Sequence, residues 1–325
     1  MTELVAFCDP DSLESEYLAT VLAERRVPQN LFYLLDGAGS FYTYRSEDLM
    51  QIAWQDEYQF FVRHQASFRG RQAFISLGCG NSGPEKPLLH QMAAEGGDFA
   101  YFGIDSSEAM LRLAAENLAD ASFTRTFVLA DFTRPDFADQ LARLVADFDT
   151  RIYAMIGATF GNFDQVWLAG LLKRLVPAGD YLYLDIVPMY GSDEKDRWLK
   201  ERFSQLPENL RLFFDRLLSA LRLSREYGEV VGVEQADDHL DTICYTFFFR
   251  ATQTTTLSCL GEEMTLSPGD QIELLSIRAY DIPSLEGFMA QHGFRLVDTY
   301  IPDVGNLSHL WQRLLFVKEI AASGM

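Results

Sequence analysis

The sequence predicts an α/β protein built on a doubly wound parallel sheet with helices on both faces. Three observations predict this class. From residue 73 onward, short apolar runs alternate with helical patterns, a glycine-rich turn follows the first run, and acidic residues end the second and third runs. Strands separated by helices of this length form parallel sheets, and such sheets bind ligands beyond the carboxyl ends of their strands.

The alternating region begins at residue 73 and ends near residue 187. Its predicted strands are Ala73–Leu77, Phe99–Ile104, Thr124–Leu129, Ile152–Ile156 and Tyr181–Ile186. The helical patterns between them are Pro84–Ala94, Ser107–Leu118, Asp136–Ala146 and Asp164–Leu175. A short apolar run bounded by turn residues is typical of a buried strand, and an amphipathic period of 3.6 is typical of a helix.

The alternation stops after Pro188, where strands begin to follow one another without intervening helices. This part carries a helical pattern and then the runs Thr242–Arg250, Thr254–Cys259 and Ile272–Ala279. It indicates an inserted α+β substrate subdomain at 188–281. The core would then comprise 66–187 and 282–325, with a last helix and two strands returning to the main sheet. Residues 1–65 are aromatic-rich and predict a helical N-terminal cap.

Composition narrows the possible partners. The 325 residues carry a formal net charge of −20, which disfavours nucleic acid and anionic membranes because phosphate binding depends on Lys and Arg. No apolar run reaches the ~18 residues of a membrane span, and the acidic start does not resemble a signal peptide. The four cysteines and five histidines lack metal-ligand spacing, so we expect no metal and a cytoplasmic protein.

The glycine-rich turn predicts close approach of the backbone to a ligand. The stretch Gly78-Cys79-Gly80-Asn81-Ser82-Gly83 satisfies G-x-G-x-x-G, a pattern in which the absence of Cβ atoms lets N–H groups reach the ligand. Pro84 suits the first turn of the following helix. The pattern alone does not distinguish a dinucleotide from another nucleoside.

Two strand-end acids narrow the choice of ligand. Asp105 can accept hydrogen bonds from a ribose diol, which a nicotinamide dinucleotide would also offer. Asp131 can accept from an adenine amino group, and Phe132 offers a flat apolar wall beside it. Lys86 places a cation near the helix start, where a phosphate or the carboxylate of a methionine tail would suit it.

This set of features resembles the class I S-adenosylmethionine-dependent methyltransferases, which have a Rossmann-like sheet. "IGATFGNF", residues 156 to 163, is similar to the "LGSTIGNF"-like stretch of the histidine-specific methyltransferase family, to which the ergothioneine-pathway enzyme belongs. The resemblance implies S-adenosylmethionine as cofactor, S-adenosylhomocysteine as product and Asn162 as the residue that grips the substrate. The cofactor-binding residues that it implies are Gly78, Gly80, Lys86, Asp105, Ser106, Asp131, Phe132, Gly157 and Thr159.

The family's substrate contacts are matched less well. Its Glu and Ser that contact imidazole fall on Leu275 and Ile277, or on Leu274 and Ser276 when the match slides by one residue. Both registers lack the acid, so we expect a small amino acid or amine other than histidine, with an apolar or aromatic side chain. A two-residue gap would instead bring Glu273 to the position of the acid.

The family's substrate tyrosine has two imperfect counterparts in the first 65 residues. "FYTYRSED" points to Tyr42 or its neighbour Phe41, and "DEYQFFVR" points to Tyr58.

Methyl transfer from a sulfonium is an in-line displacement, so the protein mainly positions and desolvates its reactants. Asn162 is the candidate catalytic residue because it would orient the acceptor. Two alternatives remain at this point: an NAD(P)-dependent oxidoreductase, and a catalytically inactive methyltransferase-like binding module. The partner is expected to be a small molecule, and the oligomeric state is open.

Overall fold

The structure is a computed structural model of the chain. It describes residues 2–31, 57–157, 159–189, 197, 201, 208–235, 239–259, 261–302 and 311–320.

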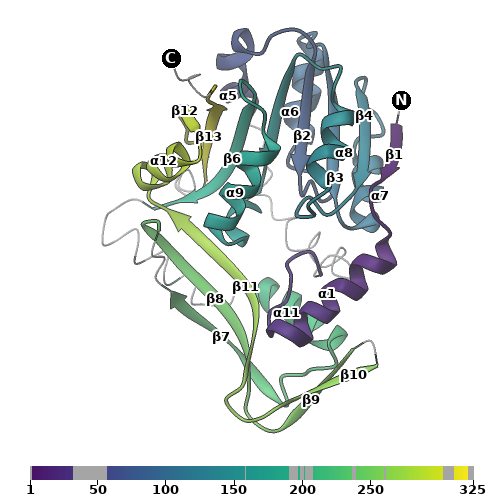
Figure 1. The fold of residues 1–325 in the computed structure, drawn as a ribbon, viewed down its shortest axis with the longest axis vertical. Coiled ribbons are helices and arrows are strands. Elements are labelled where there is room, and N and C mark those ends of the chain that lie inside the picture. Colours follow the sequence, from purple (N-terminus) through teal and green to yellow (C-terminus); the bar gives the residue numbers. More distant parts are fainter. Residues whose placement is uncertain are drawn as a thin grey trace.

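A parallel sheet forms the upper part of the molecule in the view of Figure 1. Its strands lie in the order β4-β3-β2-β5-β6, and each neighbouring pair is parallel. The strands are β2 (Gln72–Leu77), β3 (Phe99–Asp105), β4 (Thr124–Leu129), β5 (Thr150–Met155) and β6 (Tyr181–Pro188). The helices that connect them are α6 (Lys86–Ala94), α7 (Glu108–Asn117), α8 (Phe137–Leu144) and α9 (Gln165–Leu175). Every strand predicted for this region is confirmed.

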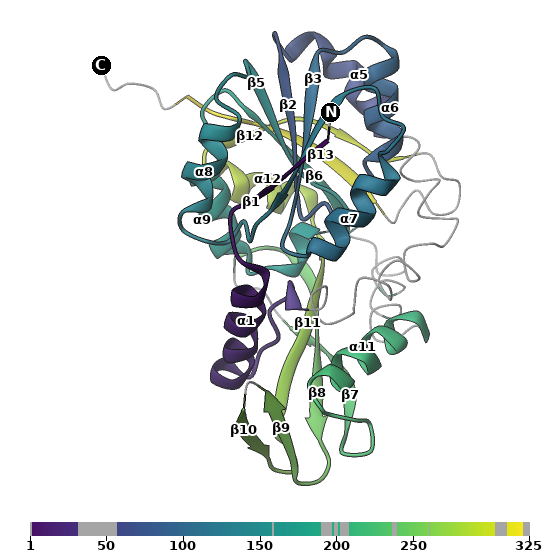
Figure 2. The same ribbon diagram turned by 90° about the vertical axis from the view of Figure 1, so that its right-hand side faces the viewer.

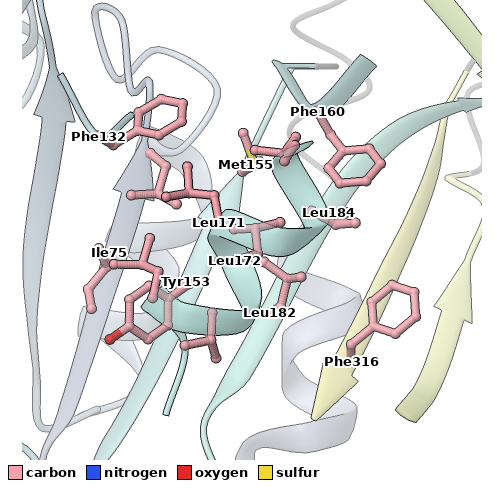
Figure 3. Packing of buried hydrophobic residues seen from close by; sticks show 14 of the residues in the cluster. Ile75, Phe132, Tyr153, Met155, Phe160, Leu171, Leu172, Leu182, Leu184 and Phe316 are labelled. Atoms are coloured by element: carbon pink, nitrogen blue, oxygen red, sulfur yellow. The ribbon is translucent and has the colours of Figure 1, made fainter. Parts of the chain in front are cut away.

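Helices cover both faces of the sheet, with α8 and α9 on one side and α6 and α7 on the other (Figure 2). One hydrophobic cluster therefore joins Ile75 of β2 to Leu172 of α9, and a second joins Phe74 of β2 to Leu88 of α6. Figure 3 shows the first cluster, in which side chains of β5, β6 and α9 meet. Burial on both faces explains why the strands are continuous apolar runs.

A C-terminal unit extends the sheet beyond β6. It consists of α12 (Ile282–Gln291), β12 (Phe294–Tyr300) and β13 (Gln312–Lys318). Strand β13 pairs antiparallel with β6 and with β12. The predicted return of the chain to the main sheet is confirmed, and the whole is a Rossmann-like α/β fold.

The segment between β6 and α12 builds a second layer beyond the carboxyl ends of the parallel strands (Figure 1). Its elements are α11 (Glu208–Ala220), β7 (Gly228–Gln235), β8 (Thr242–Ala251), β9 (Thr255–Cys259), β10 (Glu262–Leu266) and β11 (Gln271–Tyr280). Strand β11 pairs antiparallel with β8 and is parallel to β6 only at Ala279 and Tyr280. The sheet thus runs continuously from the core into this inserted segment. Its definition as a substrate subdomain at 188–281 stays a proposal.

The N-terminal residues differ from the helical cap that the sequence predicts. Residues Thr2–Ala6 form strand β1, which pairs parallel with β4 at the edge of the main sheet. Helix α1 (Pro10–Glu24) and helix α5 (Glu57–His64) follow, with the short helix η1 (Gln65–Ser67) after them. Strand β1 is short and lies at an edge, so its sequence lacks the apolar run that marks the inner strands.

Helix α1 belongs to the core of the insertion. Leu13 and Val21 are fully buried and join a hydrophobic cluster with Phe214 of α11 and Leu274 of β11. Helix α5 instead packs on the main sheet, where the ring of Phe61 lies 4.8 Å from that of Tyr183. The N-terminal part therefore contributes to both layers. No helix in the described ranges is long and apolar enough to cross a membrane.

Replacement of Leu13 by Ala tests the membership of α1 in the insertion's core. Loss of a fully buried leucine should lower the free energy of unfolding by about 2–5 kcal/mol. The matched control is Leu4, which is 55% exposed on β1. Leu4→Ala should change the free energy of unfolding by less than about 0.5 kcal/mol. Guanidinium denaturation measures the stability of both variants. Equal losses in the two would contradict the assignment of α1 to the insertion's core.

Candidate active site

The glycine turn lies at the carboxyl end of β2. Gly78 and Gly80 have φ values of 73° and 53°, which side chains with a Cβ rarely adopt. The N–H groups of residues 78 and 79 both donate to the carbonyl of Ile104 at 2.9 Å, which ties the turn to β3. A Cβ on Gly78 would lie 3.3 Å from Cγ2 of Thr159. The turn therefore lacks a side chain at Gly78 because its backbone closely approaches the loop after β5.

A buried polar network supports this turn from behind, and no sequence motif indicated it. The hydroxyl of Ser76 donates to Glu85 at 2.5 Å, and Glu85 is 1% exposed. The hydroxyls of Ser82 and Tyr101 lie 2.8 Å apart. These contacts join the start of α6 to β2 and β3, which fixes where the turn sits.

Asp105 ends β3 and faces the glycine turn. Its carboxylate accepts from the N–H of Gly80 and from that of Ser107, both at 2.9 Å. Burial raises the pKa of Asp105 to about 6, while hydrogen bonds from the N–H groups of Ser107, Gly80 and Ser106 oppose the shift. Ser106, the neighbouring candidate, is 6% exposed.

Asp131 and Phe132 follow β4 at the same edge of the sheet. One oxygen of Asp131 accepts from the N–H of Thr133 at 2.8 Å, and the other accepts from the hydroxyl of Tyr17 at 2.6 Å. The ring of Phe132 is buried and meets the ring of Phe163 edge-on, 5.5 Å between centroids. The sequence did not point to Tyr17, because a tyrosine in an N-terminal helix carries no signal of this contact.

The turn after β5 carries the candidate catalytic residue. It includes the 3₁₀ helix η2 (Thr159–Asn162), at whose end the half-buried Asn162 lies. Gly157 precedes η2 with a φ of 74°, and its N–H donates to Asp185 of β6 at 3.0 Å. Asp185 is fully buried, so it holds the start of the turn from inside the sheet.

The insertion contacts the other end of this turn. Nη1 of Arg278 on β11 donates to the carbonyl of Gly161 at 3.2 Å and to that of Phe163 at 2.9 Å. These carbonyls flank Asn162. The inserted sheet is thereby joined to the residue that the sequence predicts to orient the acceptor.

Three of the predicted site residues are not brought to this edge by a described contact. The ammonium of Lys86 lies 3.5 Å from the carboxylate of Asp120, and both side chains are largely exposed. Tyr42 lies outside the described residues. Tyr58 belongs to α5, but its side chain lies outside the described part of the structure.

A β-bulge in β11 changes the register on which the acceptor prediction depends. The pairing with β8 shifts between Glu273 and Leu275, and Leu274 is 1% exposed in the hydrophobic core of the insertion. Oγ of Ser276 lies 3.4 Å from Oε1 of Glu273 and 2.8 Å from Oγ1 of Thr246. The extra residue of a bulge explains how an acid three positions before the serine reaches it. Glu273 thus lies beside Ser276, and its service as the family's acid, which a two-residue gap would allow, stays a prediction.

The residues at this edge fit a nucleoside cofactor. The strands β2 to β5 bring the bare turn at Gly78, the carboxylates of Asp105 and Asp131, and the Asn162 turn to their carboxyl ends, where doubly wound sheets bind ligands. Each carboxylate oxygen has two lone pairs, so the three N–H donors to Asp105 and the two donors to Asp131 leave acceptor capacity on both carboxylates. The remaining lone pairs can accept from ribose hydroxyls and from an amino group. Among the described residues, no group of three His, Cys, Asp or Glu is placed to hold a metal.

The protein is an S-adenosylmethionine-dependent methyltransferase with a Rossmann-like α/β fold. The model of the histidine-specific, S-adenosylmethionine-dependent methyltransferases matches residues 15–184, just over half of the chain. The chain belongs to this family. The match excludes the NAD(P)-dependent oxidoreductase that the glycine turn and Asp105 had left open, and the predicted cofactor, S-adenosylmethionine, is confirmed.

Solved methyltransferases resemble the chain at low identity. One from Clostridium acetobutylicum is 12% identical with a TM-score of 0.44, covering 87% of this chain and 98% of its own. The 1,6-didemethyltoxoflavin N1-methyltransferase of Burkholderia thailandensis is 11% identical with a TM-score of 0.45, covering 97% and 92%. CcbJ from Streptomyces caelestis is 15% identical with a TM-score of 0.39, covering 83% and 95%. No curated protein matches the chain in sequence.

The raised pKa of Asp105 predicts a pH dependence of cofactor binding. If Asp105 binds the cofactor ribose, as the sequence predicts, its ionised form is the better acceptor for both hydroxyls, and the free protein must lose a proton from Asp105 to bind when the pH is below about 6. Affinity for S-adenosylhomocysteine should therefore be constant above pH 7 and about tenfold weaker at pH 5. Calorimetry between pH 5 and 8 measures this, with Asp105→Asn as the variant in which the dependence should vanish. The same slope in that variant would contradict the assignment.

Proposed function

We propose that the protein transfers the methyl group of S-adenosylmethionine to the amino nitrogen of a small amino acid or amine. The acceptor would lie between the carboxyl ends of the parallel strands and the inserted sheet. The observation that carries this proposal is the pair of hydrogen bonds from Arg278 to the carbonyls of Gly161 and Phe163, because they bring the insertion onto the turn of Asn162.

We assign the cofactor to the loops after β2, β3, β4 and β5. The N–H groups near Gly78 and Gly80 would approach its amino-acid tail, Asp105 its ribose and Asp131 its adenine, with Phe132 against the ring. We assign three further residues to the same cofactor site: Gly157, Thr159 and Ser106. Lys86 would have to leave Asp120 to reach a carboxylate bound at the turn.

The bound cofactor supplies a methyl group on a sulfonium, and the acceptor nitrogen attacks it in line. The protein's part is to align the two and to exclude water. Asn162 would hold the acceptor through its amide. Asp185 acts through the backbone, because its carboxylate accepts from the N–H of Gly157 and is fully buried, so the structure favours a supporting role over that of a base.

The inserted sheet presents polar groups close to this turn. Ser276 lies two residues before Arg278, so the two side chains share one face of β11, roughly 7 Å apart. Glu273 and Thr246 lie beside Ser276. A site that hydrogen-bonds a polar side chain rejects apolar ones strongly, because its own buried groups are then left unpaired. We therefore propose an acceptor with a hydrogen-bonding side chain, and histidine, which the register at Leu275 had disfavoured, becomes the first to test.

Competition among amino acids tests the acceptor class. Histidine should be methylated at least tenfold more efficiently in kcat/KM than phenylalanine or leucine, with tryptophan and tyrosine between them. Glu273→Gln should lower kcat/KM for histidine by about ten- to a hundredfold, as expected for a lost hydrogen bond to a charged group. The control is Glu263→Gln on the exposed hairpin, which should have no effect.

A preference for leucine or phenylalanine would restore the apolar acceptor predicted from the sequence. Tight binding of S-adenosylhomocysteine with no turnover on any amine would instead indicate a binding module.

Replacement of Asn162 by Ala separates acceptor positioning from cofactor binding. Turnover with the best acceptor should fall about a hundredfold, because a positioning contact is lost, while the Kd for S-adenosylhomocysteine stays within a few-fold. Gln140→Ala removes an amide from the surface of α8 and serves as the control. A fully active Asn162→Ala variant would leave Asn162 as a turn residue only.

A further inference from the structure

The N-terminal helix contacts the acid that we assign to adenine. The hydroxyl of Tyr17 in α1 donates to Oδ2 of Asp131 at 2.6 Å, and Nδ2 of Asn30 donates to the Tyr17 oxygen at 3.0 Å. Tyr17 is 8% exposed and Asp131 is 5% exposed. This contact links α1, which belongs to the insertion's core, to the cofactor edge of the main sheet.

The direction of this hydrogen bond is fixed by chemistry. An ionised carboxylate only accepts, so the phenol is the donor. Burial, followed by the nearby charge of Asp131, raises the pKa of Tyr17, so the phenol keeps its proton throughout the ordinary pH range. Asn30 occupies an acceptor site on the phenol oxygen, which leaves the hydroxyl proton directed at Asp131.

Two donors therefore hold the Asp131 carboxylate from opposite sides. The N–H of Thr133 donates to Oδ1, and the hydroxyl of Tyr17 donates to Oδ2. The two contacts fix the plane of the group, so its remaining lone pairs point in set directions. A base that presents an amino group meets an acceptor there. A base that presents a carbonyl meets a negative charge.

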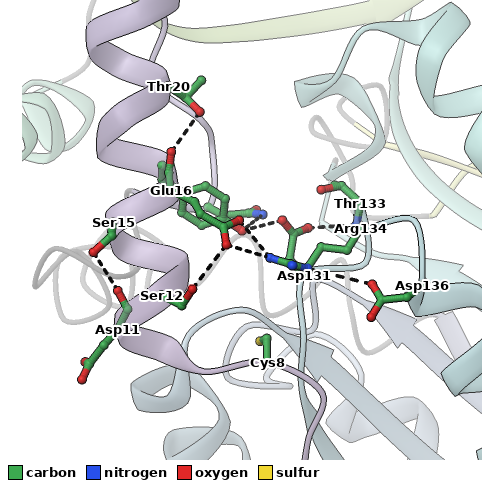
Figure 4. Close-up of polar contacts among 12 residues, drawn as sticks. Cys8, Asp11, Ser12, Ser15, Glu16, Thr20, Asp131, Thr133, Arg134 and Asp136 are labelled. Carbon is green, nitrogen blue, oxygen red and sulfur yellow. Dashed lines mark hydrogen bonds and ion pairs between the residues drawn. The ribbon is translucent and has the colours of Figure 1, made fainter.

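A second contact attaches the same turn of α1 to the same loop (Figure 4). Glu16 and Arg134 form an ion pair at 2.8 Å, and the N–H of Arg134 donates to the carbonyl of Asp131 at 3.2 Å. Both side chains of this pair are partly exposed, so it contributes little energy on its own. It does show that residues 16 and 17 together face the loop after β4.

We propose that Tyr17 is a positioning residue that sets the nucleobase selectivity of the cofactor site. It does so by holding the Asp131 carboxylate in a fixed orientation as an acceptor for the exocyclic amino group of adenine. The inference rests on the proposed assignment of Asp131 to adenine. It adds that recognition of the base depends on a side chain from the N-terminal helix, outside the region of the glycine turn and the strand-end acids.

Calorimetry with two nucleosides tests this proposal. S-adenosylhomocysteine carries the amino group, and S-inosylhomocysteine carries a carbonyl oxygen in its place. The unmodified protein should prefer the adenosyl compound by at least a hundredfold. In Tyr17→Phe the Kd of the adenosyl compound should rise about tenfold, and the preference over the inosyl compound should shrink about tenfold, because the carboxylate of Asp131 loses one of its two donors and can rotate.

The matched control is Tyr153→Phe. Tyr153 is 2% exposed in the core beneath α9, so the variant also removes a buried phenol hydroxyl, but away from the cofactor edge. Its affinities and preference should equal those of the unmodified protein. Asn30→Ala is a second variant that leaves the ring of Tyr17 in place, and it should reduce the preference a few-fold in the same direction.

The outcomes distinguish this proposal from the cofactor assignment. If Tyr17→Phe and Asn30→Ala lower only the melting temperature and keep both affinities, Tyr17 is structural and the proposal is overturned. If Asp131→Asn abolishes the preference while Tyr17→Phe retains it, the adenine assignment stands and the role of Tyr17 falls. If Asp131→Asn also keeps the preference, the assignment of Asp131 fails and the proposal fails with it.

Discussion

The hydrogen bonds from Arg278 to the carbonyls of Gly161 and Phe163 connect the two layers of the molecule where the chemistry is proposed. The turn between these carbonyls leaves the parallel sheet at Gly157, whose N–H is held by Asp185. A side chain thus fixes each end of the turn, Asp185 from the sheet and Arg278 from the insertion. The position of Asn162 therefore depends on how the two layers are joined.

The second constraint is the burial of two acids, Asp105 and Asp131, at the carboxyl ends of the parallel strands. Asp105 is almost fully buried, and its pKa rises because burial costs more than its N–H donors return. Asp131 is equally buried but receives one N–H donor and one phenol donor. The two carboxylates therefore differ in what holds them. Backbone N–H groups hold the acid proposed for the ribose, whereas the acid proposed for adenine also depends on the N-terminal helix.

Short sequence patterns predicted those parts of the structure whose conformation depends on a few consecutive residues. The inner strands, the bare turn at Gly78 and the acids Asp105 and Asp131 each follow from short stretches, because burial on both faces and positive φ leave clear residue signatures. Strand β1 and the bulge at Leu274 left no such signature. A bulge adds one residue to one strand, and only its pairing partner reveals it. Alignment by sequence alone therefore placed leucines where the acid was expected.

Several of the contacts missed from the sequence involve the N-terminal segment, which links both layers. From the middle of α1, Tyr17 and Glu16 contact the loop of Asp131. Beyond its C-terminal end, the N–H of Val27 donates to the carbonyl of Glu273 at 2.8 Å, beside the bulge. A displacement of α1 would thus disturb both the proposed adenine contact and strand β11, which carries Glu273 and Ser276. The packing of α1 into the insertion's core makes such a displacement costly, so the same helix stabilises both halves of the site in one arrangement.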